Sequence, residues 1–305
     1  MSVQTYLASD SGALYLTGQV GSLENILTSC LVTGYGSKQP AGWTNPYYDG
    51  LHNSVLKAEP LGNEFYLRLN DGYTGYENIM VMCGFSKMTA LNTGDDATPS
   101  AVQSPFGVGV LKSITKDAIA RGWMIVANNK FFYLFINHNS SSNFATADGY
   151  CFGEFISFRD INLDPDKFNL IITGRSPTDY NNVSNSFGTF SPTNESISNH
   201  WLMRSYTQVG SSILCGKHSD TSKDLLPFPN PVDGNLFLSP VFVTEPTINC
   251  VRGRLPGLWN VCHNGSYFNH GDTFNGNGAL AGKSFMIVKC NGRTYALETS
   301  DTWYA

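Results

Sequence analysis

Only one segment of this chain spaces its apolar residues as an amphipathic helix would. In SLENILTSCLVTGYG, which begins at Ser22, five apolar residues fall on one stripe at spacings of three and four: Leu23, Ile26, Leu27, Cys30 and Leu31. Ser22 can cap the first turn, and Gly34 can end the last one. The pattern therefore predicts a helix over residues 22–33 that packs against a sheet.

In the rest of the chain, short apolar runs are separated by Gly, Asn, Asp and Pro residues that favour turns. This pattern is typical of β-strands joined by turns. Up to residue 173 the predicted strands are 53–58, 64–69, 79–84, 108–114, 122–127, 131–136, 149–158 and 168–173. Beyond residue 200 they are 201–209, 212–216, 235–244, 247–252, 283–289 and 293–298. The fold is thus predicted to be mainly β: two β-rich lobes, sandwich- or barrel-like, with one N-terminal helix packed on a sheet.

Two pairs of these strands are predicted to form hairpins. WMIVA and FFYLFI are joined by residues 128–130, Asn-Asn-Lys, and asparagine tolerates the left-handed backbone angles of tight turns. Both strands are apolar on both faces, so this hairpin should be central and covered on each side. Residues 290–292, Cys-Asn-Gly, form the turn of the second predicted hairpin.

Residues 174–200 interrupt the pattern of strands. This segment, GRSPTDYNNVSNSFGTFSPTNESISNH, is polar and has few residues able to seed a core. It divides the chain into an N-terminal lobe, 1–173, a polar loop or linker, 174–200, and a C-terminal lobe, 201–305. Ordering each residue costs about 1–2 kcal/mol of backbone entropy, so we expect the segment to become ordered only against another chain.

The charge balance narrows the possible partners. Charged residues make up 14% of the chain, against about 25% in ordinary soluble domains, and the net charge is −5. No lysine- or arginine-rich run is present to neutralise phosphates, which argues against nucleic acid as a partner. No apolar stretch approaches the roughly 20 residues of a membrane helix, and the N-terminus lacks the pattern of a signal peptide. We expect the protein to fold in a cytoplasm and to bind no membrane.

No metal site is expected from the cysteines and histidines. The seven cysteines are scattered, without a C-x-x-C pair, and are interpreted as reduced and structural. The densest group of soft ligands matches no zinc spacing: Cys250, Cys262, His263 and His270. Arg252 and Arg254 lie beside it in the sequence and would repel a cation. The alternative interpretation is a cysteine in a strand and two histidines in a loop.

The segment GALAGKS, residues 278–284, resembles a phosphate-binding loop only superficially. Asn277 stands where the first glycine of a P-loop belongs, and FMIVK follows as a strand where the motif requires a helix. The segment is therefore predicted to be a glycine-rich turn in which Lys283 begins a strand and contacts no nucleotide. No cofactor is expected.

No motif in the sequence strongly indicates a catalytic site. The chain lacks G-x-S-x-G, and the adjacent residues His218, Ser219 and Asp220 indicate a surface turn more than a triad. Two carboxylate pairs, Asp148 with Glu154 and Asp164 with Asp166, would serve sugar hydrolysis only if they faced each other across a cleft. Solvated acids in turns are the alternative, and no catalytic residue is assigned.

The aromatic segment GWTNPYYDG offers a possible ligand contact. Trp43, Tyr47 and Tyr48 could stack on a sugar ring, or they could belong to the core or to an interface. A glycan-binding protein would be expected to have a shallow cleft edged by Trp43, Tyr47 or Trp303. A host glycan is thus a possible but unsupported partner.

Several long segments together resemble a family of uncharacterised virion structural proteins encoded in tailed-phage morphogenesis clusters. They are LTGQVGSLENILTSCLVTGYGSKQPAGWT from Leu16, GWMIVANNKFFYLF from Gly122, FGEFISF from Phe152, SYTQVGSSILCGKHSD from Ser205, PFPNPVDGNLFLSPV from Pro227, and VRGRLPGLWNVCHN from Val251 with the following HGDTFNGNGALAGKSF. Within them, LPGLW is predicted to place a Pro-Gly turn between apolar anchors, which would fix a loop shape for subunit contacts.

The resemblance implies a non-enzymatic structural subunit of a bacteriophage virion, placed in the tail, the neck (collar) or the baseplate. Its expected partners are other virion proteins and further copies of itself in a symmetric homo-oligomer. A capsid-decorating protein and a receptor- or glycan-binding tail-tip protein are the alternatives within the particle. A particle-borne glycan hydrolase is the enzymatic alternative.

Overall fold

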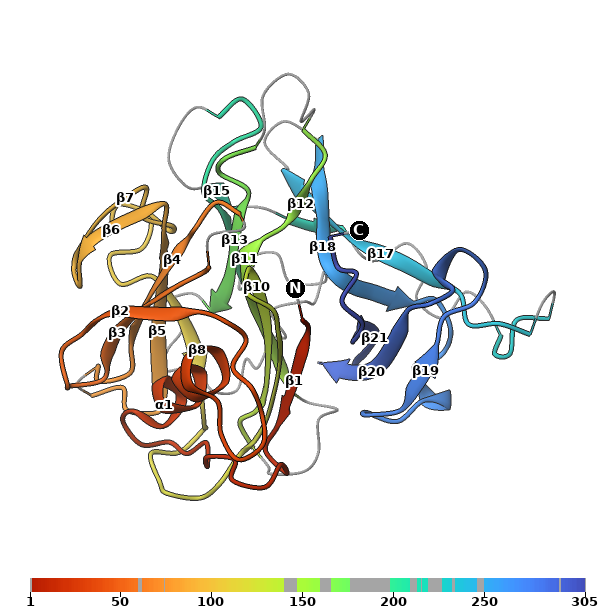
Figure 1. Ribbon diagram of the computed structural model, residues 1–305, viewed down its shortest axis with the longest axis horizontal. Coiled ribbons are helices and arrows are strands. Elements are labelled where there is room, and N and C mark those ends of the chain that lie inside the picture. The colour runs from red at the N-terminus through yellow and green to blue at the C-terminus, as the bar shows by residue number, and fades with distance from the viewer. Residues whose placement is uncertain are drawn as a thin grey trace.

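The computed structural model describes residues 2–59, 62–73, 75–139, 147–159, 166–175, 198–208, 213–214, 216–218, 227–231, 234–245, 250–290 and 292–304. These residues form two large antiparallel β-sheets and one short helix that lies against the first sheet (Figure 1). The predicted mainly β architecture, with two β-rich lobes and an N-terminal helix on a sheet, is confirmed. No helix among the described residues is long and apolar enough to cross a membrane.

The first sheet curls into a half-barrel with the strand order β1-β9-β10-β11-β13-β8-β5-β4-β3-β2. Its strands are β1 (Gln4–Leu7), β2 (Thr44–Tyr48), β3 (Asn53–Lys57), β4 (Tyr66–Asn70), β5 (Ile79–Phe85), β8 (Val108–Leu111), β9 (Gly122–Ala127), β10 (Phe131–Asn137), β11 (Asp148–Glu154) and β13 (Leu170–Arg175). A small separate hairpin is formed by β6 (Lys87–Ala90) and β7 (Thr93–Asp95).

Two further strands, β14 (Ser198–Leu202) and β15 (Ile213–Leu214), extend the first sheet from β13. The prediction of a second-lobe strand at 201–209 is therefore wrong. Trp201 lies opposite Ile172 of β13, and its side chain joins the core of the first sheet. The apolar run at this point could be read from the sequence, but the sheet that it joins could not.

The helix α1 (Ser22–Thr28) continues as a wider π-helical turn, η1 (Ser29–Thr33), and ends at Gly34, whose φ is 79°. Its predicted extent is confirmed, and its apolar stripe is buried against the first sheet. The prediction that Ser22 caps the first turn is wrong, since its hydroxyl donates to the carbonyl of Thr17. The carboxylate of Asp71, distant in sequence, accepts the free helical N–H groups instead.

The central hairpin of β9 and β10 is confirmed. The strands pair antiparallel, with Phe132 opposite Ala127, and Trp123 and Phe132 are 1% and 0% exposed. The turn works differently from the expectation, because neither asparagine has a positive φ. The side-chain oxygen of Asn128 accepts hydrogen bonds from the backbone N–H groups of Lys130 and Phe131.

The second sheet has the order β16-β17-β18-β21-β20-β19, with β12 also pairing with β18. Its strands are β12 (Ile156–Ser157), β16 (Gly216–His218), β17 (Leu238–Glu245), β18 (Cys250–Val261), β19 (Thr273–Asn275), β20 (Ser284–Cys290) and β21 (Arg293–Glu298). The predicted hairpin of the last two strands is confirmed, with Gly292 at a φ of 71° in its turn.

The Pro-Gly turn predicted in LPGLW is wrong, because these residues lie inside the long strand β18. Trp259 is opposite Pro240 of β17, but Arg254 is opposite Phe242, so β18 has extra residues between two paired stretches. Gly257 adopts a φ of 67° within this irregularity. Pro256 and Gly257 therefore bend a strand where a chain reversal was expected.

The two sheets face each other and share an apolar core. Side chains of β9 and β10 that point away from α1 pack with Leu258 and Val288 of the second sheet and with Trp303, which follows β21. The central hairpin is thus covered on both faces, as its double-sided apolar pattern predicts. Residues 176–197, most of the predicted polar loop, lie outside the described residues, and the proposed boundaries of the two lobes remain predictions.

Candidate functional site

Of the two carboxylate pairs considered for sugar hydrolysis, the structure describes one completely, Asp148 with Glu154, and these two do not form a catalytic pair. Asp148 and Glu154 lie at the two ends of β11, about 20 Å apart at the usual rise of a strand. Glycosidase carboxylates are separated by roughly 5–9.5 Å. Each carboxylate also accepts a hydrogen bond within the protein. Asp148 Oδ2 accepts from the guanidinium of Arg175 at 2.5 Å, and Glu154 Oε1 accepts from the backbone N–H of Asn63 at 2.5 Å. Asp164 lies outside the described residues.

The cysteine and histidine group is dispersed by the fold. Cys250 begins β18 and Cys262 follows its end, on the order of 35 Å away along the strand. The ring of His263 accepts from the N–H of Phe237 at 2.7 Å, and the ring of His270 accepts from the N–H of Lys289 at 3.3 Å. The described residues contain no group of three or more His, Cys, Asp or Glu placed to hold a metal ion.

The glycine-rich segment lacks the geometry of a P-loop. One 3-10 turn, η6 (Gly278–Leu280), precedes the strand β20, which begins one residue after Lys283. The ammonium of Lys283 donates to Glu298 Oε2 at 3.0 Å and to Thr302 Oγ1 at 2.8 Å. These contacts hold it in the protein, and a strand follows as predicted. Of the adjacent candidates, Ser219 and Asp220 lie outside the described residues.

The tryptophans expected at the edge of a glycan cleft belong to the interior. Trp43 is 3% exposed, packs against Phe132 and Phe152, and donates from Nε1 to the carbonyl of Asn128. Trp303 is also 3% exposed and donates to the carbonyl of Glu298. Neither ring can stack on a sugar, so the expected cleft is wrong for these two residues.

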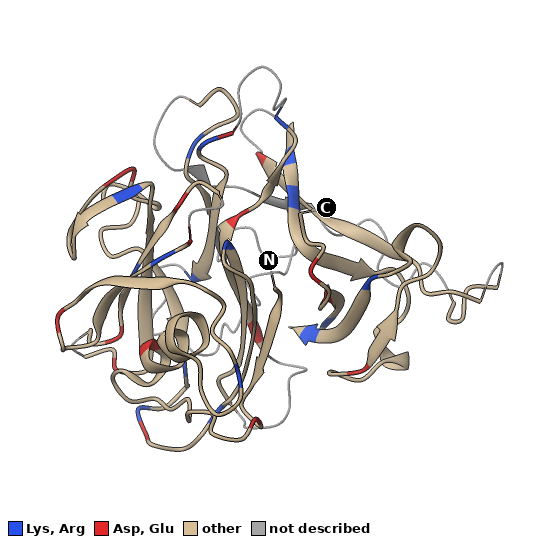
Figure 2. Cartoon of the chain, viewed as in Figure 1, with Lys and Arg blue, Asp and Glu red and all other residues tan. Residues whose placement is uncertain are grey.

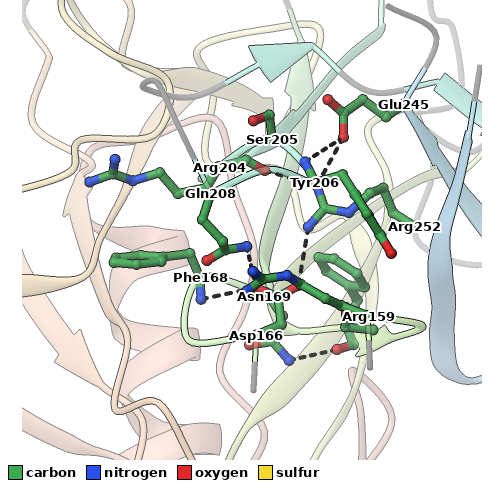
Figure 3. Close-up of polar contacts among 12 residues, drawn as sticks. Arg159, Asp166, Phe168, Asn169, Arg204, Ser205, Tyr206, Gln208, Glu245 and Arg252 are labelled. Carbon is green, nitrogen blue, oxygen red and sulfur yellow. Dashed lines mark hydrogen bonds and ion pairs between the residues drawn. The ribbon is translucent and has the colours of Figure 1, made fainter. Parts of the chain in front are cut away.

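A buried ionic network lies where the two sheets meet, and Arg252 of β18 is its centre (Figure 3). Its guanidinium donates to Glu245 Oε2 at 3.0 Å and to Asp166 Oδ2 at 3.1 Å, and it also contacts the carbonyl of Arg204. The side chain of Arg252 is fully buried. Glu245 ends β17 and Asp166 precedes β13, so one cation connects both sheets.

The two acids of this network are fully engaged. Asp166 also accepts from the hydroxyl of Ser157 at 2.7 Å and from the side-chain amide of Gln208 at 3.0 Å (Figure 3). Glu245 accepts from the backbone N–H of Tyr206 at 2.9 Å. Both carboxylates thus have at least one donor besides the guanidinium of Arg252. The network therefore joins the two sheets.

A cavity of about 660 Å³ lies in the second sheet, and sequence reasoning did not find it. Aromatic and aliphatic side chains form most of its wall, including Phe228, Trp259 and Phe274. The glycine-rich stretch 276–280 forms part of its rim. The sequence drew attention to that stretch for its glycines, but the aromatic residues that complete the cavity come from distant segments.

Comparison with known proteins adds no assignment. No family model matches the chain, and no curated protein matches it significantly. The described residues offer a buried ionic network around Arg252 and a largely apolar cavity in the second sheet, in a chain with few charges.

Proposed function

We propose that this chain is a non-enzymatic structural subunit of a tailed-bacteriophage virion, placed in the tail, the neck or the baseplate, and that it acts through subunit contacts. The observation that carries the proposal is an exposed apolar surface on two adjoining loops of the first sheet. We call it the apolar loop surface, and it consists of Leu14, Tyr15, Val20, Ile114 and Ile119.

The two loops of this surface are held rigidly side by side. Leu16 bridges to Arg121, and the N–H of Gly18 donates to the carbonyl of Asp117 at 3.0 Å. A Cβ atom at Gly18 would lie 1.9 Å from the carbonyl oxygen of Thr115, so only glycine permits this approach. The loops thus present apolar side chains on a fixed frame, and grouped exposed apolar residues are typical of protein contact sites.

The exposures are large for side chains of this kind. Tyr15 is 77% exposed and Ile119 is 61% exposed. Tyrosine is enriched at interfaces, where it contributes a large contact area at a small cost in conformational entropy. Exposed apolar side chains grouped in this way favour burial against a partner chain.

The distribution of charge supports the same function. Several of the charged side chains are buried inside the protein and do not contribute to its surface, among them Asp71, Lys112, Arg252 and Asp166. Long stretches of both sheets carry no charged residue (Figure 2). The cores of protein interfaces are depleted in charge, because a covered charge loses its hydration.

The experiment that tests the proposal is electron microscopy of the purified particle, combined with quantitative mass spectrometry of its proteins. We expect this chain at a copy number set by the symmetry of the tail, neck or baseplate. Density on the capsid lattice would assign it to capsid decoration instead. Absence from purified particles would overturn the proposal.

A further inference from the structure

The cavity lies in the second sheet, whereas the apolar loop surface belongs to loops of the first sheet. We infer that the cavity of the second sheet is a binding site for a neutral saccharide, with aromatic rings as its floor and asparagine side chains at its rim. Its volume of about 660 Å³ falls within the roughly 300–1,000 Å³ of small-molecule sites. The inference does not depend on the virion proposal, because it can be tested on the purified chain.

The floor is built on one buried ring, Phe285. Phe274 of β19 stacks on it with the ring centres 5.2 Å apart and an angle of 15° between the planes. Trp259 of β18 meets the same ring edge-on at 6.4 Å. Phe285 is only 1% exposed, so the two outer rings rest on a fixed base. Rings held in place before a ligand arrives lose little conformational freedom on binding.

Another part of the wall comes from the segment before β17 and from the residues that follow β18. Phe228 packs against Phe268 with ring centres 4.9 Å apart, and both rings line the cavity. The side-chain amide of Asn277 donates to Asn235 Oδ1 at 3.1 Å. This bond joins the loop after β19 to the segment before β17, so the curled sheet closes around the aromatic rings.

The rim keeps hydrogen-bonding groups available. Thr273 and Asn275 alternate with Phe274 along β19 and point to the other face of the sheet, so the hydrogen-bonding groups of the rim come from the loop that follows. The side-chain amide of Asn277 donates one N–H to Asn235, and its second N–H and its Oδ1 have no partner among the described residues. The rim thus offers both donors and acceptors above an apolar floor.

The charges of the lining select the class of ligand. Among the described residues, no lysine, arginine or histidine lines the cavity, and Asp272 is its one carboxylate. A phosphate, a carboxylate or a sialylated sugar would find no cation there. A purely apolar ligand would cover the rim amides without satisfying them. A neutral pyranose ring has apolar C–H faces for the aromatic floor and hydroxyl groups at its edge for the rim.

The test uses the purified full chain on an array of neutral and sialylated glycans, followed by calorimetric titration of lactose, maltotriose and chitotriose. We expect a neutral saccharide to bind. Phe274→Ala should weaken its affinity roughly tenfold or more, because the stacking surface is lost. Asn277→Ala should weaken it about fivefold, the value of one hydrogen bond. Tyr48→Ala removes an exposed aromatic ring of the first sheet and should leave the affinity unchanged.

The thermal unfolding midpoint separates loss of binding from loss of fold. Asn277 is an exposed side chain at the rim, so its alanine variant should unfold close to the temperature of the wild type. Failure of every neutral saccharide to bind, binding of sialylated glycans alone, or equal affinity in both cavity variants and the wild type would each overturn the inference. Binding of the apolar dye anilinonaphthalene sulfonate alone would also overturn it and would indicate an apolar protein segment as the occupant.

Discussion

The buried ammonium of Lys112 donates to the carboxylate of Asp71, and both side chains are fully buried. Asp71 follows β4 and Lys112 follows β8, the two strands that flank β5. The other carboxylate oxygen of Asp71 accepts from the N–H groups of Leu23 and Glu24 at 2.9 Å and 3.0 Å. One ion pair therefore fixes the start of α1 to the half-barrel, in place of a local cap.

We predict that Asp71→Asn destabilises the protein by about 3 kcal/mol or more, because it leaves the Lys112 ammonium buried without a counter-charge. The measurement is chemical denaturation followed by circular dichroism. Asp95→Asn, an exposed carboxylate on β7, should change the unfolding free energy by less than about 0.5 kcal/mol. Adding Lys112→Met to Asp71→Asn should recover part of the loss. Equal stability of Asp71→Asn and Asp95→Asn would show that the pair does not hold the helix.

The network around Arg252 predicts a second large effect. Arg252→Met should cost about 3–5 kcal/mol of unfolding free energy, because Asp166 and Glu245 would stay buried without their cation. Arg254→Met, a half-buried arginine on the same strand, is the matched control and should cost much less. Hydrogen exchange of β17 and β18 provides the readout, since the network joins them to the first sheet. Unchanged protection of these strands in Arg252→Met would contradict its role at the junction.

We predict that the buried His270 makes the stability of the folded protein depend on pH. Burial, and then the nearby charge of Lys289, lower the pKa of His270 from 6.5 to about 4 in the folded protein. Between these values the unfolded chain binds a proton and the folded chain does not, so stability is lost as the pH falls from 6.5 towards 4. His270→Gln removes this titration and keeps an oxygen that can accept from the N–H of Lys289.

The measurement for His270 is the denaturation midpoint at several pH values between 7 and 4. The wild type should lose more stability over this interval than His270→Gln. Parallel curves for the two proteins would show that His270 does not contribute to acid sensitivity.

The apolar loop surface predicts a defect in assembly without a defect in folding. Tyr15→Ser combined with Ile119→Ser should leave the unfolding midpoint nearly unchanged, because both side chains are exposed. Incorporation into particles, measured by mass spectrometry after complementation with the variant, should fall severalfold. Tyr48→Ser, another exposed aromatic residue, is the control. Normal incorporation of the double variant would place the subunit contact elsewhere.

Much of the secondary structure was predictable from local patterns. The strand boundaries at 122–127, the helix over 22–33 and the turn at Gly292 follow from apolar periodicity and from the backbone freedom of glycine. The double-sided apolar runs also indicated that the central hairpin would be covered on both faces. These features depend on residues close together in the chain, so the sequence contains the information directly.

The candidate sites were harder to predict from the sequence, because their residues come from distant segments of the chain. The cap of α1 is Asp71, and the cation that neutralises Asp166 is Arg252, which the sequence suggested only as a repellent neighbour of two cysteines. The bend at Pro256 looked like a turn because its pairing partners on β17 could not be identified beforehand. Such contacts depend on strand register, which local propensity does not specify.

The sequence by itself determined that this chain is a mainly β protein with one helix, a central apolar hairpin and few charges. Only the tertiary structure decided that Trp43 and Trp303 are core residues and that Phe274 and Trp259 line a cavity. The physical reason is that periodicity reports whether a side chain can be buried on its own element. Which surface covers it depends on how the sheet curls and which strands meet, and long-range packing of the whole chain sets both.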